Sequence, residues 1–158
     1  MKAYDDLLAH QRETMALSQV MGRLGWDQET MMPRGAVPQR AEEMAAFEGV
    51  LHARRIDPQV ADWLDAIDET ALDEVGCANL RHIRRSHERA SKVPAALAAR
   101  IARVTSEAQG AWADARAEDD FASFAPTLTE VLALKREEGQ ALAAGGDVYD
   151  AMLQDYEP

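Results

Sequence analysis

Apolar residues recur every three or four positions along most of the chain, which is the spacing of one face of an α-helix. No segment shows the strict alternation of apolar and polar residues that a half-buried strand requires, and clusters of β-branched residues are scarce. The pattern therefore predicts an all-α protein that folds as an antiparallel bundle of about six helices.

Residues that break or begin helices separate the first three predicted elements. A first helix is expected over residues 4–30, before Pro33 interrupts the pattern. A second helix begins near Pro38, because proline suits the first helical turn. Asp57 and Pro58 are typical of an N-cap followed by the first residue of a helix, so a short third helix starts there.

The fourth helix is expected to begin after a capping box that spans residues 70–73. The spacing of its apolar residues places Val75, Leu80, Ile83 and His87 on the inward face.

The fifth and sixth helices have clear apolar faces. Pro94 begins the fifth helix, and Ser123 is the expected N-cap of the sixth, with Pro126 in its first turn and Gly145 beyond its end. One seam of the fifth helix predicts packing against neighbouring helices; it comprises Leu97, Ile101, Val104, Ala108, Trp112 and Ala115. We expect the three tryptophans to anchor the core, namely Trp26, Trp63 and Trp112.

Length and charge narrow the class of protein. The 158 residues suit one domain, residues 1–158, and 17 basic against 28 acidic side chains give a formal net charge of −11. That charge disfavours nucleic acid as a partner, since phosphate backbones repel it. No apolar run approaches the roughly 18–20 residues of a membrane span. Asp5 and Asp6 replace the apolar segment of a signal peptide, so we expect a cytoplasmic protein.

The histidines and the single cysteine offer little chemistry. Cys77 alone supports neither an internal disulfide nor a cysteine-based zinc site. His87 and Glu88 begin like the zinc-binding pattern H-E-x-x-H, but Ser91 occupies the second ligand position. His82 and His87 diverge by about 140° around a helix. We interpret the histidines as half-buried or solvated.

The acidic residues and glycines also lack a catalytic arrangement. Asp27 and Glu29, like the neighbouring acids 42–43 and 137–138, diverge on a helix and are expected to be solvated or ion-paired. Gly22 and Gly25 lie in a helical pattern, which favours close packing over phosphate binding. The residues therefore indicate no catalytic, cofactor-binding or metal-ligating position in this chain.

A row of basic residues follows one side of the fourth helix. We call it the basic row; it comprises Arg81, Arg85, Arg89 and Lys92. Acidic residues precede it in the chain, at Asp62, Asp65, Glu69 and Asp73. The arrangement is typical of neighbouring surface ion pairs, each contributing about 0–1 kcal/mol. The alternative is a docking face for an acidic partner or for another part of a larger protein.

Five blocks of sequence resemble, in order, the N-terminal region of the carboxypeptidase Taq family of zinc metallocarboxypeptidases. The first block reads W-D-Q-E-T-M-M-P-R-G-A from Trp26, followed by R-A-E from Arg40. The other four are Lys92-Val93-Pro94, residues 111–126 (A-W-A-D-A-R, then D-F and F-A-P), residues 134–137 (L-K-R-E) and residues 148–158 (V-Y-D-A-M-L-Q-D-Y-E-P).

The resemblance implies a large helical enzyme that removes C-terminal residues from peptides. Its single divalent metal, zinc or cobalt, would be held by an H-E-x-x-H motif and a later glutamate beyond residue 158. We therefore expect residues 1–158 to form a non-catalytic wall or lid over the cleft that receives the peptide substrate. The alternative hypothesis is a free-standing helical protein-interaction module.

The last residues carry an apolar stripe that needs cover, formed by Tyr149, Met152, Leu153 and Tyr156. Downstream sequence would cover it in a longer enzyme. In the absence of such sequence a second copy of the chain would do so, and we accordingly expect a homo-oligomer, most simply a dimer.

Overall fold

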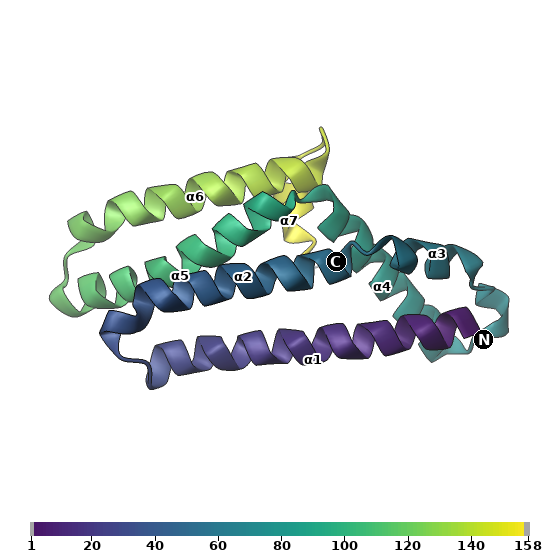
Figure 1. The fold of residues 1–158 in the computed structure, drawn as a ribbon. Coiled ribbons are helices and arrows are strands. Elements are labelled where there is room, and N and C mark those ends of the chain that lie inside the picture. Colours follow the sequence, from purple (N-terminus) through teal and green to yellow (C-terminus); the bar gives the residue numbers. More distant parts are fainter. Residues whose placement is uncertain (1, 157–158) are drawn as a thin grey trace.

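The structure, a computed structural model, describes residues 2–156, and every regular element in that range is helical. Four long helices run lengthwise, each antiparallel to the next: α1 (Lys2–Thr30), α2 (Val37–Arg55), α5 (Ala95–Glu118) and α6 (Phe121–Ala143) (Figure 1). Helix α3 (Pro58–Ala66) is short, whereas α4 (Glu74–Lys92) has 19 residues like α2, and both lie toward the end that holds the N-terminus. Helix α7 (Val148–Leu153) packs against α6. The predicted all-α antiparallel bundle is confirmed.

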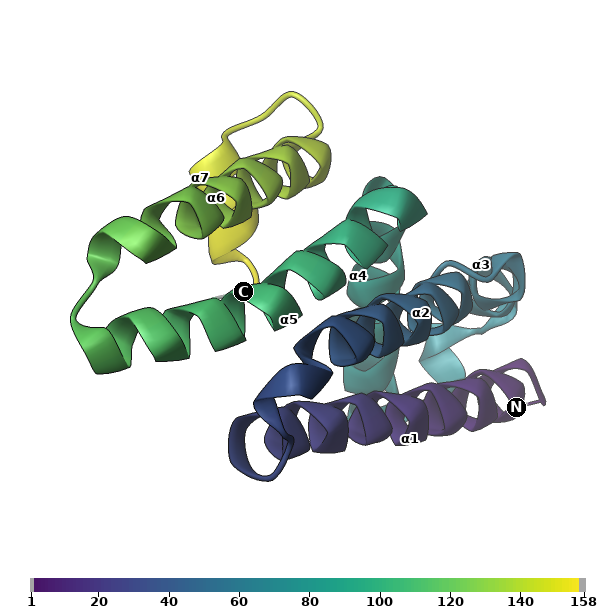
Figure 2. The same cartoon turned by 60° about the vertical axis from the view of Figure 1, so that its left-hand side comes forward.

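Small residues allow α2 and α5 to form the most extensive contact between helices. Ala41 and Ala45 of α2, and Ala98 and Ala102 of α5, are buried. Gly110 lies so close to Val37 that a Cβ atom there would come within 3.3 Å of the valine Cγ2. Figure 2 shows the α5–α6 hairpin on one side of α2 and α1 on the other. The long helices thus form a row rather than a closed ring.

The apolar core consists of two clusters. One joins α1, α3 and α4 through Leu7, Val60, Leu64 and Leu80, with Trp63 packed against it. The other joins the facing sides of α5 and α6, and its buried members are Leu97, Val104 and Leu134. The first cluster therefore supports the packing of α3 and α4 on α1, and the second supports the α5–α6 hairpin.

Helix caps follow the sequence in part. Asp57 caps α3 as predicted, and its carboxylate accepts a hydrogen bond from the backbone N–H of Gln59. The predicted capping box at residues 70–73 is wrong, because residues Glu69–Ala71 form a 3₁₀ helix, η2, capped by Asp68. Asp73 instead caps α4 directly, accepting from the N–H of Gly76 at 2.8 Å.

The prediction that Ser123 caps the sixth helix is also wrong. Asp120 is the cap, and its carboxylate accepts from the N–H of Ser123 at 3.2 Å. Asp119 adopts the left-handed conformation with φ of 54°, and the N–H of Asp120 donates to the carbonyl of Ala115 at 2.9 Å. Two aspartates therefore make the whole turn, and Pro126 lies inside α6 rather than in its first turn.

Several apolar residues expected in the core are exposed. Trp26 is 63% exposed, Trp112 is 51% exposed, and Val75 of α4 is also exposed. Trp63 is half-buried and packs against the first cluster, in line with the predicted anchoring of the core. Nothing lies within 4 Å of a Cβ atom built on Gly22 or Gly25, so the predicted close packing there is wrong. The physical reason is the row arrangement, since side-by-side helices cover only part of each apolar face (Figure 2).

Candidate functional site

Arg40 fixes the end of α1 against the start of α2. Its guanidinium is buried, donates to Asp27 at 2.6 Å and to Glu43 at 3.0 Å, and also donates to the backbone carbonyl of Leu24. The hydrogen bond to Asp27 is the main cause that raises the pKa of Arg40, against the opposing effect of burial. The R-A-E block that begins at Arg40 gives no sign that Arg40 joins α1 to α2.

A second contact ties the same turn of α1 to α5. The side-chain amide of Gln28 donates to the carbonyl of Ser106 at 2.7 Å, and the buried Ser106 hydroxyl donates back to the amide oxygen at 2.9 Å. The 3₁₀ helix η1 (Arg34–Ala36) is joined to α5 by an exposed ion pair between Arg34 and Asp114 at 2.9 Å. The W-D-Q-E-T block is therefore a rigid structural corner.

The acidic residues considered for catalysis are ion-paired or solvated, as predicted, and Glu29 is exposed. Asp27 and Glu43 pair with Arg40, and Glu42 pairs with Arg103 of α5. The later acids follow the same pattern, with Glu137 beside Arg100 and Glu138 beside Lys135. Asp27 and Glu43 thus converge on one guanidinium, which is typical of a structural ion-pair network.

The basic row of α4 holds the C-terminal end of the described chain. Arg85 donates to the backbone carbonyl of Gln154, Arg89 to that of Ala151 at 3.1 Å, and Lys92 to that of Leu142 at 3.4 Å. The acids predicted as its partners lie elsewhere, because Asp65 and Glu69 contact Arg84 on another side of the helix. Three members of the row therefore satisfy carbonyls at the ends of α6 and α7, while Arg81 is exposed.

Three of the histidines contact backbone carbonyls at helix ends. His10 and His87 contact the carbonyls of Arg54 and Arg55, which end α2. His52, only 3% exposed, contacts the carbonyl of Val93 at 2.8 Å. His82 is exposed. The interpretation of half-buried or solvated histidines is confirmed for His87 and His82, while His52 is more deeply buried than expected.

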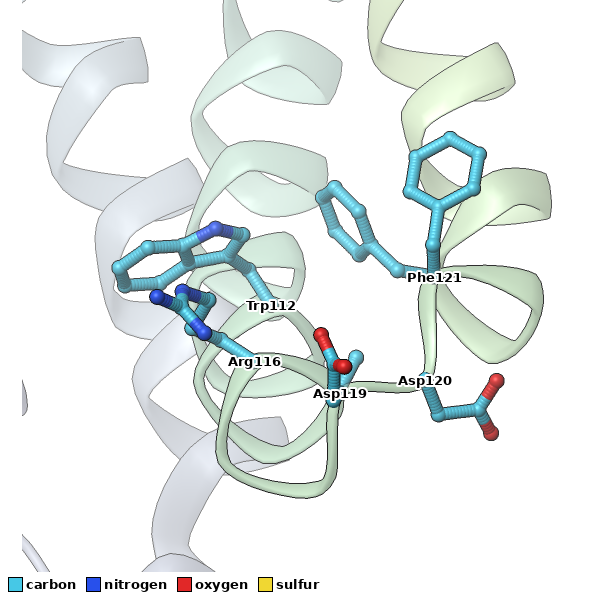
Figure 3. Close-up of a pocket in the computed structure, with 7 residues that line it drawn as sticks. Trp112, Arg116, Asp119, Asp120 and Phe121 are labelled. Atoms are coloured by element: carbon cyan, nitrogen blue, oxygen red, sulfur yellow. The ribbon is translucent and has the colours of Figure 1, made fainter.

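A pocket of about 210 Å³ lies at the turn between α5 and α6. Figure 3 shows Trp112 and Arg116 side by side on α5, across from the ring of Phe121 on α6, with Asp119 at the turn. Phe124 also lines it. Phe121 is 67% exposed, so the aromatic rings of this pocket face outward. The two-residue turn places these side chains opposite one another. The positions of these residues in the sequence do not by themselves indicate this arrangement.

The described part of the chain does not fit a metal ion. Among residues 2–156, no three histidine, cysteine, aspartate or glutamate side chains lie close enough together to hold one. None of the helices in that range has the length and apolarity needed to cross a membrane. Residues 2–156 thus supply structural contacts and an exposed aromatic pocket.

Comparison with protein families and curated relatives identifies the chain. The model of the family described as "Carboxypeptidase Taq (M32) metallopeptidase" matches residues 6–158. "Thermostable carboxypeptidase 1" of Thermus thermophilus is 38% identical over 169 residues, covering 99% of this chain and 33% of the relative. The protein of the same name from Pyrococcus furiosus is 28% identical, covering 96% and 30% respectively. The chain spans about a third of the length of these relatives.

Solved structures agree with this assignment. "Trypanosoma Cruzi Metallocarboxypeptidase 1" is 31% identical with a TM-score of 0.75, and the match covers all of this chain and 32% of that one. A structure described as "BsuCP Crystal Structure" has a TM-score of 0.93 at 20% identity, also over all of this chain and 32% of that one, which supports the fold alone. On this evidence the chain belongs to the carboxypeptidase Taq (M32) metallopeptidase family.

Proposed function

We propose that this chain is the helical N-terminal segment of a metal-dependent carboxypeptidase, where it lines or covers the cleft that receives a peptide and takes no part in the chemistry. The observation that carries the proposal is the match of 99% of this chain to a third of a thermostable carboxypeptidase. The divalent metal, zinc or cobalt, would be held by residues outside 1–158, since residues 2–156 offer no cluster that fits it.

The exposed apolar surface supports a role as one wall of a larger molecule. Trp26 and Met31 at the end of α1, and Trp112 and Phe121 near the α5–α6 turn, are all large and exposed. Extensive exposed apolar surface is uncommon on a protein that stands alone and is typical of surface that contacts something else. A wall of this kind excludes water and limits which substrates enter, which assists a reaction carried out by other residues.

A chimeric enzyme tests the proposal. This chain replaces the matched third of the Thermus thermophilus carboxypeptidase, and the product is assayed for metal-dependent release of the C-terminal residue from a blocked dipeptide. We expect activity from the chimera, because the two segments are 38% identical over nearly the whole of this chain. A chimera that melts cooperatively and retains metal, yet does not hydrolyse the dipeptide, would count against the proposal.

The 158-residue chain by itself tests the non-catalytic part of the proposal. We expect no turnover of the blocked dipeptide above a metal-only control when the chain is incubated with Zn²⁺ or Co²⁺. Turnover accompanied by one equivalent of bound metal, measured by elemental analysis, would overturn it.

The alternative of a free-standing interaction module receives less support from the contacts. Arg85, Arg89 and Lys92 donate to carbonyls within the chain, so the basic row is not simply available to an acidic partner. The homodimer and the cytoplasmic compartment stay predictions. Light scattering over a range of protein concentrations tests the dimer, which a monomer at the highest concentration would contradict.

A further inference from the structure

We infer that the pocket at the α5–α6 turn is where the remaining two thirds of a carboxypeptidase of this family docks, with an apolar side chain of that remainder entering beside Trp112. The inference rests on the proposed function and adds the point of contact. It starts from the three aromatic rings of the pocket, Trp112, Phe121 and Phe124, which stand around a volume of about 210 Å³.

The chemistry of the pocket is that of an interface centre. Tryptophan, tyrosine and arginine are enriched among the residues that dominate binding energy, and Trp112 lies next to Arg116 in Figure 3. Covering an aromatic side chain removes roughly 150–250 Å² of surface from water. An apolar side chain would pack between the aromatic rings. Polar groups beside it would face the charged side chains of Arg116 and Asp119.

The pocket is also held in shape before anything binds. Its two walls are joined by a turn of two residues, Asp119 and Asp120. The N–H of Asp120 donates to the carbonyl of Ala115, and the carboxylate of Asp120 accepts from the N–H of Ser123. Because the backbone is already fixed, docking does not have to order it, and less free energy is lost on association.

The share of the relatives outside this chain indicates the occupant. The chain covers 33% of the Thermus thermophilus carboxypeptidase, so a complete enzyme has two thirds of its chain available to cover this segment, whose exposed large apolar side chains include Trp112 and Phe121. Arg116, Asp119 and Asp120 together give the pocket a negative formal charge, which makes it a weak site for the free carboxylate of a peptide substrate.

Tryptophan fluorescence tests the inference directly. Trp26→Phe and Trp63→Phe leave Trp112 as the only indole of the 158-residue chain, and in the chimera described above the signal of Trp112 is the difference between that protein and its Trp112→Phe variant. The emission and acrylamide quenching of Trp112 are then compared between the chain and the chimera. We expect a shift of the emission to shorter wavelength and at least a twofold loss of quenching in the chimera. Trp112 that stays equally exposed in an active chimera overturns the inference and leaves the proposed function standing.

Other occupants give distinguishable results. If Trp112 is shielded from acrylamide in the 158-residue chain and this shielding is lost on dilution, the occupant is a second copy. If its emission changes when the blocked dipeptide is added, the occupant is the substrate. Either result overturns the inference. If the substituted chimera does not fold, the remainder is co-expressed as a separate chain, and co-elution with an unchanged difference signal of Trp112 overturns the inference. A folded, metal-loaded and inactive chimera counts against the proposed function.

A substitution with a matched control gives a second measurement. Phe121→Ala should lower the melting temperature of the chimera by several degrees more than that of the 158-residue chain, in which Phe121 is 67% exposed. Val75→Ala removes an equally exposed apolar side chain at the start of α4 and should shift both proteins equally. Equal shifts for Phe121→Ala would contradict the inference.

Discussion

Arg89 of α4 pairs with Asp155, two residues beyond the end of α7, at 2.7 Å. The same guanidinium donates to the carbonyl of Ala151 in the last turn of α7. Carbonyls at a helix C-terminus lack partners within the helix and carry partial negative charge, so an arginine there is favourable on both counts. Arg89 therefore helps to hold the short helix α7 in place. A helix of six residues is not stable through helical propensity alone.

Replacement of Arg89 by alanine is predicted to loosen α7 with little effect on the long helices. We expect a loss of about 1.5–3 kcal/mol, the scale of a hydrogen bond with a charged donor, and faster amide exchange over residues 148–153. Hydrogen exchange read by mass spectrometry measures this. Arg81→Ala, at an exposed arginine of the same helix, is the control. Unchanged exchange in Arg89→Ala would show that α7 is held by its apolar contacts.

Gly139 permits the close approach of α6 and α7. A Cβ atom at this position would lie 2.7 Å from Cγ1 of Val148 and 2.8 Å from the sulfur of Met152. Gly139→Ala is therefore predicted to displace α7 and to lower the melting temperature, despite the better helical propensity of alanine. Gly49→Ala, in a helical position with nothing within 4 Å, should stabilise the chain by about 0.5–1 kcal/mol. Stabilisation by both substitutions would contradict the packing argument.

Arg40 is predicted to contribute more to stability than the exposed arginines. Arg40→Met leaves Asp27 and Glu43 without their partner and the carbonyl of Leu24 without a donor, so we expect a loss of about 2–3 kcal/mol in urea denaturation. Arg40→Lys should recover part of this, since it keeps the charge but not the planar fork. Arg34→Ala, which breaks an exposed ion pair, should change stability by less than about 1 kcal/mol.

Asp68 is predicted to make stability depend on acid pH. The hydroxyl and then the N–H of Thr70 donate to its carboxylate and lower its pKa below the ordinary value of 3.8. The folded chain therefore favours the charged form, so the contribution is present above pH 3.8 and is lost as the pH falls through the folded pKa.

The measurement is a series of urea denaturations of the parent chain and Asp68→Ala from pH 7 to pH 3. The difference in stability between the two proteins should be constant down to about pH 5 and should shrink as the pH falls further. Thr70→Ala removes the hydroxyl donor and should weaken this dependence. A difference that is the same at pH 3 and pH 7 would contradict the assignment.

The sequence predicted those features that depend on neighbouring residues. The first helix was expected over 4–30 and is observed at Lys2–Thr30, because a 3.6-residue period and a following proline are both local signals. The N-cap at Asp57 was found for the same reason. The caps at Asp120 and Asp73 were missed because serine, threonine and aspartate are all good caps, and several such residues lie close together at each of these helix starts.

The exposed aromatic pocket could not be predicted. Trp112 lies on the same seam as Ala108 and Ala115, which are buried, yet half of its surface is open. The helical period of the sequence shows which face of α5 is apolar. The neighbouring helices determine how much of the length of that face is buried. At the α5–α6 turn the described residues provide no such cover, and the candidate site lies there.

By itself the sequence determined the helices, most of their ends, the family and the absence of an H-E-x-x-H motif from these residues, because each is encoded in short or ordered stretches of chain. Only the tertiary structure decided that Arg40 is buried, that the basic row binds the ends of α6 and α7, and that Trp26 and Trp112 remain outside. Those outcomes depend on which helix faces lie against one another, and burial, charge pairing and exposure are properties of contacts between residues far apart in the chain.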